Sequence, residues 1–331
     1  MCVSAGHAAD LTVDLPVRGT LDLADYADHL TGVDGSASGF RVCSPGPGEG
    51  PGSVLLRSAL FTETQYEYVE ISVRQRAPDS LAVDLTGPTE VAQEVVEQVR
   101  RMLSCDLDGD AFDSVARSDP VLTRVHARRP GLRPVLFRSP YEAACWAVVC
   151  QGLSRERTTE LVRALAESHG RVAGVGARRL WAFPPPHALV TGVRVPGLSA
   201  LKRQRLELVA EVALEGRLDA AALRALPAAD ALAEVRGLPG VGPFSAELIV
   251  GRGAGHPDLF PLRETALRRA VAGLYGTADS EVELAGLAER WRPYRGWAAF
   301  VLRDAYVTCR RCALRPPARP VPGGRGEGTR L

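Results

Sequence analysis

Apolar and polar residues alternate along the first hundred residues of the chain, a pattern that predicts strands with one buried face. Turn-forming residues separate four such runs, at 39–43, 54–61, 68–76 and 81–85. Apolar residues with helical spacing precede these runs at 21–30 and follow them at 88–103. We therefore expect a small α+β unit with an antiparallel sheet over residues 11–104, after a disordered N-terminus at 1–10.

From residue 105 onward, apolar residues recur every three or four positions, and Pro or Gly residues separate the runs. Helices are predicted at 113–126, 140–153, 155–169, from 177 to the prolines at 184–186, and at 198–213, 220–226, 228–236, 244–250, 264–275, 281–291 and 294–307. The fold class is thus mainly α, with a helical domain at 105–314. The Pro/Gly/Arg-rich residues 315–331 are expected to be disordered.

A glycine-rich hairpin, Leu238 to Gly242 (LPGVG), joins the helices predicted at 228–236 and 244–250. Gly240 and Gly242 accept positive φ and allow another backbone to come close. Pro243 suits the first turn of a helix, and Ser245 adds a hydroxyl near its start. The free N–H groups at this helix start predict a site for a phosphate. A helix–helix corner without a ligand is the alternative interpretation.

Charge is distributed unevenly along the chain, although the net charge is only +1. Residues 1–120 hold 20 acidic and 8 basic side chains, and residues 121–331 hold 19 acidic and 32 basic ones. A basic second part indicates a polyanionic partner, and a solvated basic surface is the alternative. Lys202 is the single lysine among the 40 basic residues.

The remaining composition predicts a cytosolic protein. The 331 residues, 46% of them hydrophobic, can bury a sizeable core. We find no apolar run of membrane-spanning length and no signal-type N-terminus. Seven cysteines, an odd number, fit a reduced compartment. Cys309 and Cys312 form a CxxC pair without a second pair nearby, so we expect free thiols rather than a metal site.

A carboxylate, Glu264, follows Gly242 by 22 residues, at the start of the helix predicted at 264–275. With it, the sequence resembles the helix-hairpin-helix (HhH-GPD) DNA glycosylases, most closely the AlkA-type DNA-3-methyladenine glycosylase II branch. Four more segments carry the resemblance, which spans about residues 10–310: ARRPGLR (127–133), AVVCQGLS (147–154), VPGLSALKRQRL (195–206) and WRPYRGWAAFVLRDAY (291–306). The resemblance implies a glycosylase core preceded by a small antiparallel-sheet domain.

The same resemblance implies hydrolysis of an N-glycosidic bond after the damaged nucleotide is flipped into a pocket. Glu264 would be the catalytic carboxylate that stabilises an oxocarbenium-like transition state. Family members carry Asp here, while Thr265 and Arg269 keep the usual pattern. The extra methylene of Glu moves the carboxylate by roughly an ångström, which can cost about a hundredfold in rate. A plain helix-start acid is the alternative role for Glu264, and Asp258 is the alternative catalytic carboxylate.

Two features implied by the family indicate a monofunctional enzyme without a cofactor. Strand-cutting members carry a nucleophilic lysine two residues after the second hairpin glycine. Phe244 occupies that position here, where the alkylpurine branch has an aromatic residue that lines the base pocket. The cysteines of the iron–sulfur branch are missing as well.

Further site residues follow from the resemblance. The base pocket would include Leu248 and Thr265, where the alkylpurine branch has aromatic residues, together with Trp146 and Trp297; core packing is the alternative role for each tryptophan. Gln151, Gly152 and Leu153 stand where family members insert a wedge into the DNA stack. Gly152 is at the usual wedge position, so the apolar Leu153 beside it is the expected wedge.

DNA contacts are expected from the hairpin, the wedge segment and the acid helix, at Leu238, Gly240, Val241, Gly242, Ser245, Gln151, Leu153 and Arg269. The resemblance also implies that the carbonyls of Leu238, Gly240 and Val241 can hold a monovalent cation; no catalytic metal is expected.

The sequence thus predicts a base-excision-repair glycosylase that releases alkylated purines, such as 3-methyladenine, from damaged double-stranded DNA. It is expected to be a cytoplasmic monomer, nucleoid-associated in a prokaryote, with no membrane contact and no obligate protein partner. Two alternatives stay open. One is a DNA-binding protein that recognises lesions but excises weakly because Glu replaces Asp. The other is a glycosylase for deaminated or oxidised bases.

Overall fold

The computed structural model describes residues 11–32, 39–43, 54–174 and 179–313, the last five of these by their helical backbone alone. The predicted disordered ends, 1–10 and 315–331, lie outside the described residues. So do the side chains of Cys309 and Cys312. None of the helices in the described part is long and apolar enough to span a membrane.

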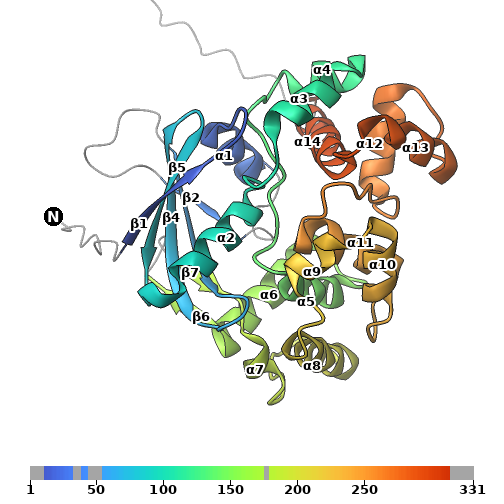
Figure 1. The fold of residues 1–331 in the computed structure, drawn as a ribbon. Helices are drawn as coiled ribbons and strands as arrows, with labels where there is room; N and C mark the ends of the chain where they lie inside the picture. Colours follow the sequence, from blue (N-terminus) through green and yellow to red (C-terminus); the bar gives the residue numbers. More distant parts are fainter. Residues whose placement is uncertain (1–10, 33–38, 44–53, 175–178, 314–331) are drawn as a thin grey trace, which may run out of the picture.

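Five strands form one antiparallel sheet in the order β1-β5-β4-β3-β2 (Figure 1). They are β1 (Leu11–Pro16), β2 (Arg41–Cys43), β3 (Leu55–Phe61), β4 (Tyr68–Ala77) and β5 (Ser80–Thr86). Alternate residues of β4 are buried, as the period of two predicts. Helices α1 (Leu23–Gly32) and α2 (Ala92–Met102), the latter preceded by the 3-10 turn η2 (Thr89–Val91), complete the predicted α+β unit.

The rest of the described chain is mainly helical, as predicted. The helices and short strands are α3 (Gly109–Arg117), α4 (Pro120–His126), α5 (Pro140–Cys150), α6 (Arg155–His169), β6 (Arg171–Ala173), β7 (Leu180–Ala182), α7 (Pro186–Leu189), α8 (Ala200–Leu214), α9 (Ala220–Ala225), α10 (Ala228–Arg236), α11 (Pro243–Leu248), the π-helical turn η4 (Ile249–Ala254), α12 (Thr265–Tyr275), α13 (Glu281–Ala288), the 3-10 turn η5 (Glu289–Trp291) and α14 (Arg295–Ala313).

Buried side chains form two large clusters. One joins the sheet and α1–α4 to the C-terminal helices α12–α14, so the two ends of the described chain share a core. The other belongs to α5, α6 and the helices from α8 to α11. Figure 1 shows α3, α4 and α14 side by side above the α5–α11 group. The boundary between the two clusters is where a cavity forms.

Several sequence predictions differ from the structure: the helix predicted at 140–153 ends at Cys150, and β6 and α7 were not predicted. The helix predicted from 177 is wrong, because Leu180–Ala182 forms β7, which pairs with β6 and buries Leu180 and Ala182 near Ala59. The helix predicted at 113–126 divides into α3 and α4, since Pro120 interrupts the hydrogen-bond ladder and starts a new helix. The edge strand β1 was not predicted; it pairs with β5 along its whole length.

Asp119 connects the start of α4 to the C-terminal helices. Its buried carboxylate accepts hydrogen bonds from the N–H groups of Val121 and Leu122, from Tyr275 Oη at 2.9 Å and from Trp291 Nε1 at 3.1 Å. Burial alone would raise the pKa of this carboxyl, but these donors outweigh it and hold the pKa below its ordinary value.

Replacing Asp119 with Ala is expected to lower the free energy of unfolding by about 2 kcal/mol, because a helix cap is lost and buried donors are left without an acceptor. Urea unfolding at neutral pH measures this loss. The depressed pKa means that the wild-type advantage exists above the unfolded pKa and disappears as the pH falls through the folded pKa. An advantage that persisted at low pH would contradict this account.

Candidate active site

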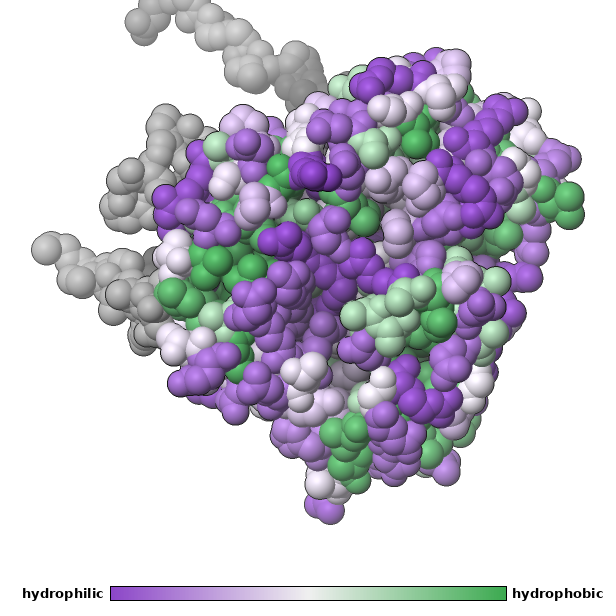
Figure 2. All heavy atoms as spheres, in the orientation of Figure 1, coloured by the Kyte–Doolittle hydropathy of each residue, from purple (hydrophilic) through white to green (hydrophobic). Residues whose placement is uncertain are grey.

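A cavity of about 440 Å³ lies between the two hydrophobic clusters. Pockets between packed units are common binding sites, and this volume suits a small-molecule-sized group. Its walls come from α1, α5, α6, α11, the turn η4, α12 and α14. The lining side chains include His29, Leu30, Phe137, Trp146, Cys150, Leu153, Arg155, Phe244, Glu247, Leu248, Arg252, Glu264, Trp297, Phe300 and Arg303. On the face shown in Figure 2, hydrophilic side chains fill the centre, between α2 and α9.

Glu264 lies in the cavity wall as the N-cap residue of α12. Its backbone is extended there, and its side chain makes no capping bond to the helix. The carboxylate instead accepts a hydrogen bond from Arg303 Nε of α14 and forms an ion pair with it. The Glu264 side chain keeps 27% of its surface exposed, so a group inside the cavity can reach the carboxylate.

A second guanidinium, that of Arg252, lines the same cavity. Its Nε and Nη2 atoms donate to Val135 O at 3.1 and 2.6 Å, and it lies 5.4 Å from the ring centre of Phe300. Burial, with the charge of Arg303 nearby, lowers the pKa of Arg252 to about 10. The cavity thus holds two cations close to Glu264.

Arg252 and Arg303 were not among the predicted site residues. Helical spacing gives a signal for Arg303, because Ala299, Phe300 and Arg303 are three or four residues apart on α14 and all line the cavity. Arg252 lies in the π-helical turn, whose side-chain directions a 3.6-residue period does not give.

Glu247, another residue that the prediction missed, links α11 to the segment before Glu264. Its side chain is buried, and its Oε2 atom accepts the backbone N–H of Arg263 at 2.7 Å. Burial raises the pKa of Glu247 to about 7, although the N–H groups of Arg263 and Leu262 and the charges of Arg263 and Arg236 oppose the shift.

The raised pKa of Glu247 predicts a pH dependence of stability. The folded chain holds this proton more tightly than the unfolded chain, so the stabilisation is present below pH 4.5 and is lost as the pH rises to about 7. Glu247→Gln keeps an acceptor without the charge and should raise the free energy of unfolding near neutral pH by on the order of 2 kcal/mol. Thermal melts across this range measure the difference.

The matched control is Glu211→Gln, at an exposed position of α8. This control should keep the wild-type pH dependence. A Glu247→Gln curve parallel to the wild-type curve would contradict a titrating Glu247.

Two large apolar side chains are exposed at the cavity. Phe244, the first residue after Pro243 on α11, is 43% exposed, and Leu153 is 38% exposed. Both line the cavity, as do Leu248 and Trp146. Apolar groups that stay accessible beside a cavity are typical of a binding surface.

The two other predicted pocket residues differ from these. Trp297 lines the cavity but is 2% exposed and stacks on Phe112 with ring centres 4.1 Å apart, so most of it belongs to the core. Thr265 is exposed in the first turn of α12 and is not among the cavity-lining residues.

The hairpin has the predicted tight geometry. Gly240 has a φ of +78°, and Val241 N–H donates to Leu238 O at 3.2 Å. Gly242 is the N-cap of α11 and has no side chain to bond the first amides of that helix. Leu238 and Ser245 are buried. The predicted cation ligands fit chemically, because backbone carbonyl oxygens replace water around monovalent cations and the Leu238 carbonyl keeps a free lone pair.

Residues 151–153, here called the wedge turn, follow α5 directly. Gly152 has a φ of +69°, which favours glycine, and a Cβ added to it would have no atom within 4 Å apart from its chain neighbours. Gln151 Oε1 accepts a hydrogen bond from Arg205 Nη1 at 2.6 Å. On α12, Arg269 is exposed, whereas Arg268 forms ion pairs with Asp279 and Glu281.

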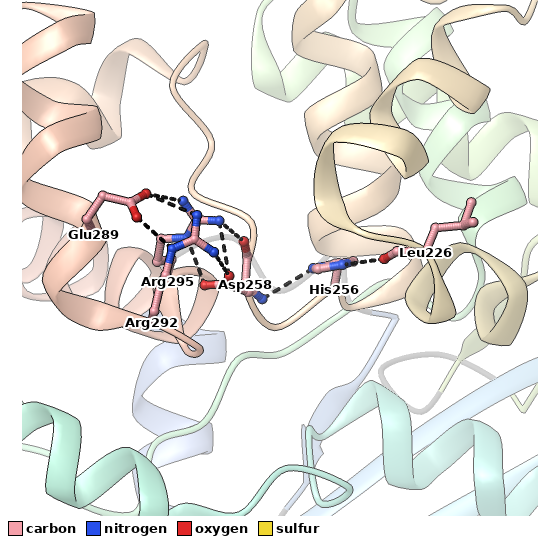
Figure 3. Close-up of polar contacts among 6 residues, drawn as sticks. All are labelled: Leu226, His256, Asp258, Glu289, Arg292 and Arg295. Carbon is pink, nitrogen blue, oxygen red and sulfur yellow. Dashed lines mark hydrogen bonds and ion pairs between the residues drawn. The ribbon is translucent and has the colours of Figure 1, made fainter.

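Asp258, the alternative carboxylate, belongs to a separate polar cluster (Figure 3). Its carboxylate oxygens accept hydrogen bonds from Arg292 at 2.5 Å and from Arg295 at 2.7 Å, and both arginines also bind Glu289. Its backbone N–H donates to His256 Nδ1, so the proton of that ring is on Nε2 and is donated to Leu226 O at 3.0 Å. Asp258 is not among the cavity-lining residues.

The N-terminal unit also contributes to the cavity. His29 of α1 lines it and is hydrogen-bonded through Nδ1 to Asp304 at 2.7 Å, and Arg129 forms an ion pair with the same carboxylate. Burial lowers the pKa of His29, and Asp304 partly opposes this. No group of three or more His, Cys, Asp or Glu residues that could hold a metal ion is found in the described part of the chain.

Comparisons with known proteins find similarity to DNA-3-methyladenine glycosylases and AlkA-type DNA repair enzymes. No protein-family model matches the chain. A DNA-3-methyladenine glycosylase of Bacillus subtilis is 22% identical over 216 residues, which cover 63% of this chain and 71% of the relative. A probable bifunctional transcriptional activator/DNA repair enzyme AlkA of Mycobacterium tuberculosis is 32% identical over 209 residues, or 60% of this chain and 40% of the relative.

One solved structure shares nearly the whole fold. A 3-methyladenine DNA-glycosylase from Archaeoglobus fulgidus superposes with a TM-score of 0.71 at 19% identity, over 92% of this chain and 100% of that protein. The five-stranded sheet and the helical part therefore both have counterparts in that protein.

Proposed function

We propose that this chain, a member of the HhH-GPD DNA glycosylase superfamily with AlkA-like homologues, hydrolyses the N-glycosidic bond of damaged purines in DNA. Glu264 carries the proposal, because it places an accessible carboxylate in the wall of a base-sized cavity. The kinship to 3-methyladenine glycosylases favours alkylated purines as the substrate class.

The chemistry needs little beyond that carboxylate. With the damaged nucleotide flipped into the cavity, the bond between C1′ and the base nitrogen breaks and its electron pair leaves with the base. Positive charge develops on the sugar, where Glu264 stabilises it. Water then adds to C1′ and loses a proton, which leaves an abasic site. Arg303 occupies one carboxylate oxygen, Oε1, so the other oxygen faces the sugar or the water.

Strand cutting is not part of the proposed function. A lyase step needs a free amine that forms a Schiff base with C1′. Lys202, the chain's single lysine, donates to two backbone carbonyls and is not among the cavity-lining residues. Phe244 occupies the position of the nucleophile in lyase members. We therefore expect hydrolysis alone.

Double-stranded DNA is the proposed partner. The hairpin and the start of α11 would bind backbone phosphate, with a monovalent cation on the carbonyls of Leu238, Gly240 and Val241 supplying positive charge there. Arg269 would add a phosphate contact, and Leu153, exposed at the wedge turn, would fill the space left by the flipped base.

A second candidate function is favoured by Arg252 and Arg303. Two guanidinium groups beside the cavity repel a permanently cationic base and can donate to a carbonyl oxygen. This arrangement favours neutral damaged purines, such as the deaminated base hypoxanthine, over cationic alkylated ones.

Single-turnover base release tests these functions. Excess protein is mixed with a duplex that carries one hypoxanthine, and separately with methylated DNA, and the free base is measured by chromatography. Release from either substrate supports a glycosylase and identifies its substrate class. Tight binding of an abasic duplex without any release would instead support a lesion-binding protein.

A further inference from the structure

We propose that Lys202 and Arg205 of α8 are positioning residues that hold the wedge turn and the hairpin at a fixed separation. The two residues are called the α8 brace below. The inference rests on the proposed function in one respect: it takes the wedge turn and the hairpin to be the elements that meet DNA.

Lys202 fixes the start of the wedge turn. Its Nζ atom donates to Val149 O at 2.6 Å and to Gln151 O at 2.7 Å. These carbonyls belong to the end of α5, where the helix dipole favours a positive charge. Leu153 N–H to Cys150 O, at 3.1 Å, is the local backbone bond of the turn, and Gly152 has no neighbour within 4 Å of its Cβ position. Lys202 therefore supplies two of the bonds that give this exposed turn its shape.

Arg205 contacts both elements. Its Nη1 atom donates to Gln151 Oε1 at 2.6 Å. Its stem lies against the hairpin, since a Cβ added to Gly240 would be 3.1 Å from both Cδ and Nε of Arg205. One side chain thus connects the wedge turn with Gly240 of the hairpin. The approach explains a glycine at position 240 in addition to its positive φ.

Packing of α8 against the rest of the protein holds the α8 brace in place. Lys202 and Arg205 are three residues apart and share one face of α8. Further along α8, Leu206 and Val209 on the same face and the adjacent Ala210 are buried in the second hydrophobic cluster, and Ser199 caps the start of the helix. Because this helix is fixed, a hairpin seated on the DNA backbone sets where Leu153 stands relative to the base stack. The hairpin can then bind the DNA backbone while Leu153 is already in position to replace the flipped base.

The test separates extrusion from affinity. A duplex carries an abasic analogue with 2-aminopurine as its neighbour, whose fluorescence rises when the wedge unstacks it. Lys202→Met and Arg205→Met keep the aliphatic stems and remove the donors. Arg203→Met, which removes the same charge from α8 without touching the wedge turn or the hairpin, is the matched control. Lys202→Arg tests rescue by a residue that keeps the donors.

We expect Lys202→Met and Arg205→Met to reduce the fluorescence rise at saturating protein, and the single-turnover rate, by about tenfold. Their affinity for undamaged duplex should fall no more than that of Arg203→Met, and Lys202→Arg should recover most of the signal. Melting curves check that each variant is folded.

Two results for Lys202→Met and Arg205→Met would contradict the α8 brace. One is a fluorescence rise at saturating protein equal to that of Arg203→Met. The other is a loss of duplex affinity alone, which would mean that Lys202 and Arg205 only bind DNA phosphates. The abasic analogue has no base to release, so the fluorescence assay tests the brace even if the wild-type chain proves to lack glycosylase activity.

Discussion

Replacing Glu264 with Gln lowers single-turnover base release by about a hundredfold to a thousandfold if this side chain is the catalytic carboxylate. Glutamine has nearly the same shape and can still contact Arg303, but it carries no negative charge to oppose the cation that develops on the sugar. The loss should therefore appear in the rate at saturating protein rather than in binding of an abasic duplex. Glu211→Gln, on the exposed side of α8, should behave like wild type.

Glu264→Asp separates two explanations for the longer side chain. Arg303 Nε holds the carboxylate of Glu264, so the pocket is built around glutamate, and shortening it by a methylene should cost about tenfold to a hundredfold. A gain of activity in the Asp variant would mean that Glu264 impairs excision, and would favour the lesion-binding interpretation. A wild-type rate of base release in Glu264→Gln would show that Glu264 is not the catalytic carboxylate.

Removing the charge of Arg303 should change which bases are released. At roughly 5 Å and an effective dielectric constant of about 20, two unit charges interact by about 3 kcal/mol. Arg303→Gln should therefore raise release of cationic 7-methylguanine relative to neutral hypoxanthine by about tenfold to a hundredfold. Release of the two bases from matched duplexes gives this ratio directly.

The control for Arg303 is Arg290→Gln, which removes an exposed charge outside the cavity. Its ratio should equal that of the wild type. An unchanged ratio in Arg303→Gln would show that the guanidinium only positions Glu264. Equal decreases in the release rates of the two bases would lead to the same conclusion, because a misplaced Glu264 carboxylate slows the release of every base.

Local pattern was enough to predict much of the fold. The helices at 155–169 and 228–236 have the observed bounds, since their apolar residues recur at helical spacing. The hairpin also follows from local residues, and the start of the helix predicted at 264–275 is correct to within one residue, since Glu264 is the N-cap of α12. β1 was missed because it depends on a distant partner, β5. β6 and β7 were missed or misassigned because each has only three residues, too few for a period of two to be recognised.

The rest of the candidate site depends on contacts between distant segments. Arg303 is 39 residues from Glu264, and His29 reaches the cavity from the N-terminal unit. Glu247 becomes unusual only because the fold buries it. A charged residue on a helix has no local signature of burial or pairing, so its role is visible only once the helices are packed.

The hydrophobic cluster shared by the two ends of the chain has a consequence for biosynthesis. The face that α1, α3 and α4 turn toward α14 emerges from the ribosome first, and its partner emerges last. At about 5–20 residues per second, that face waits for on the order of ten seconds before it can be covered. We expect the nascent chain to need chaperone protection during this interval, and a chain that stops before α14 to aggregate rather than to fold as a smaller protein.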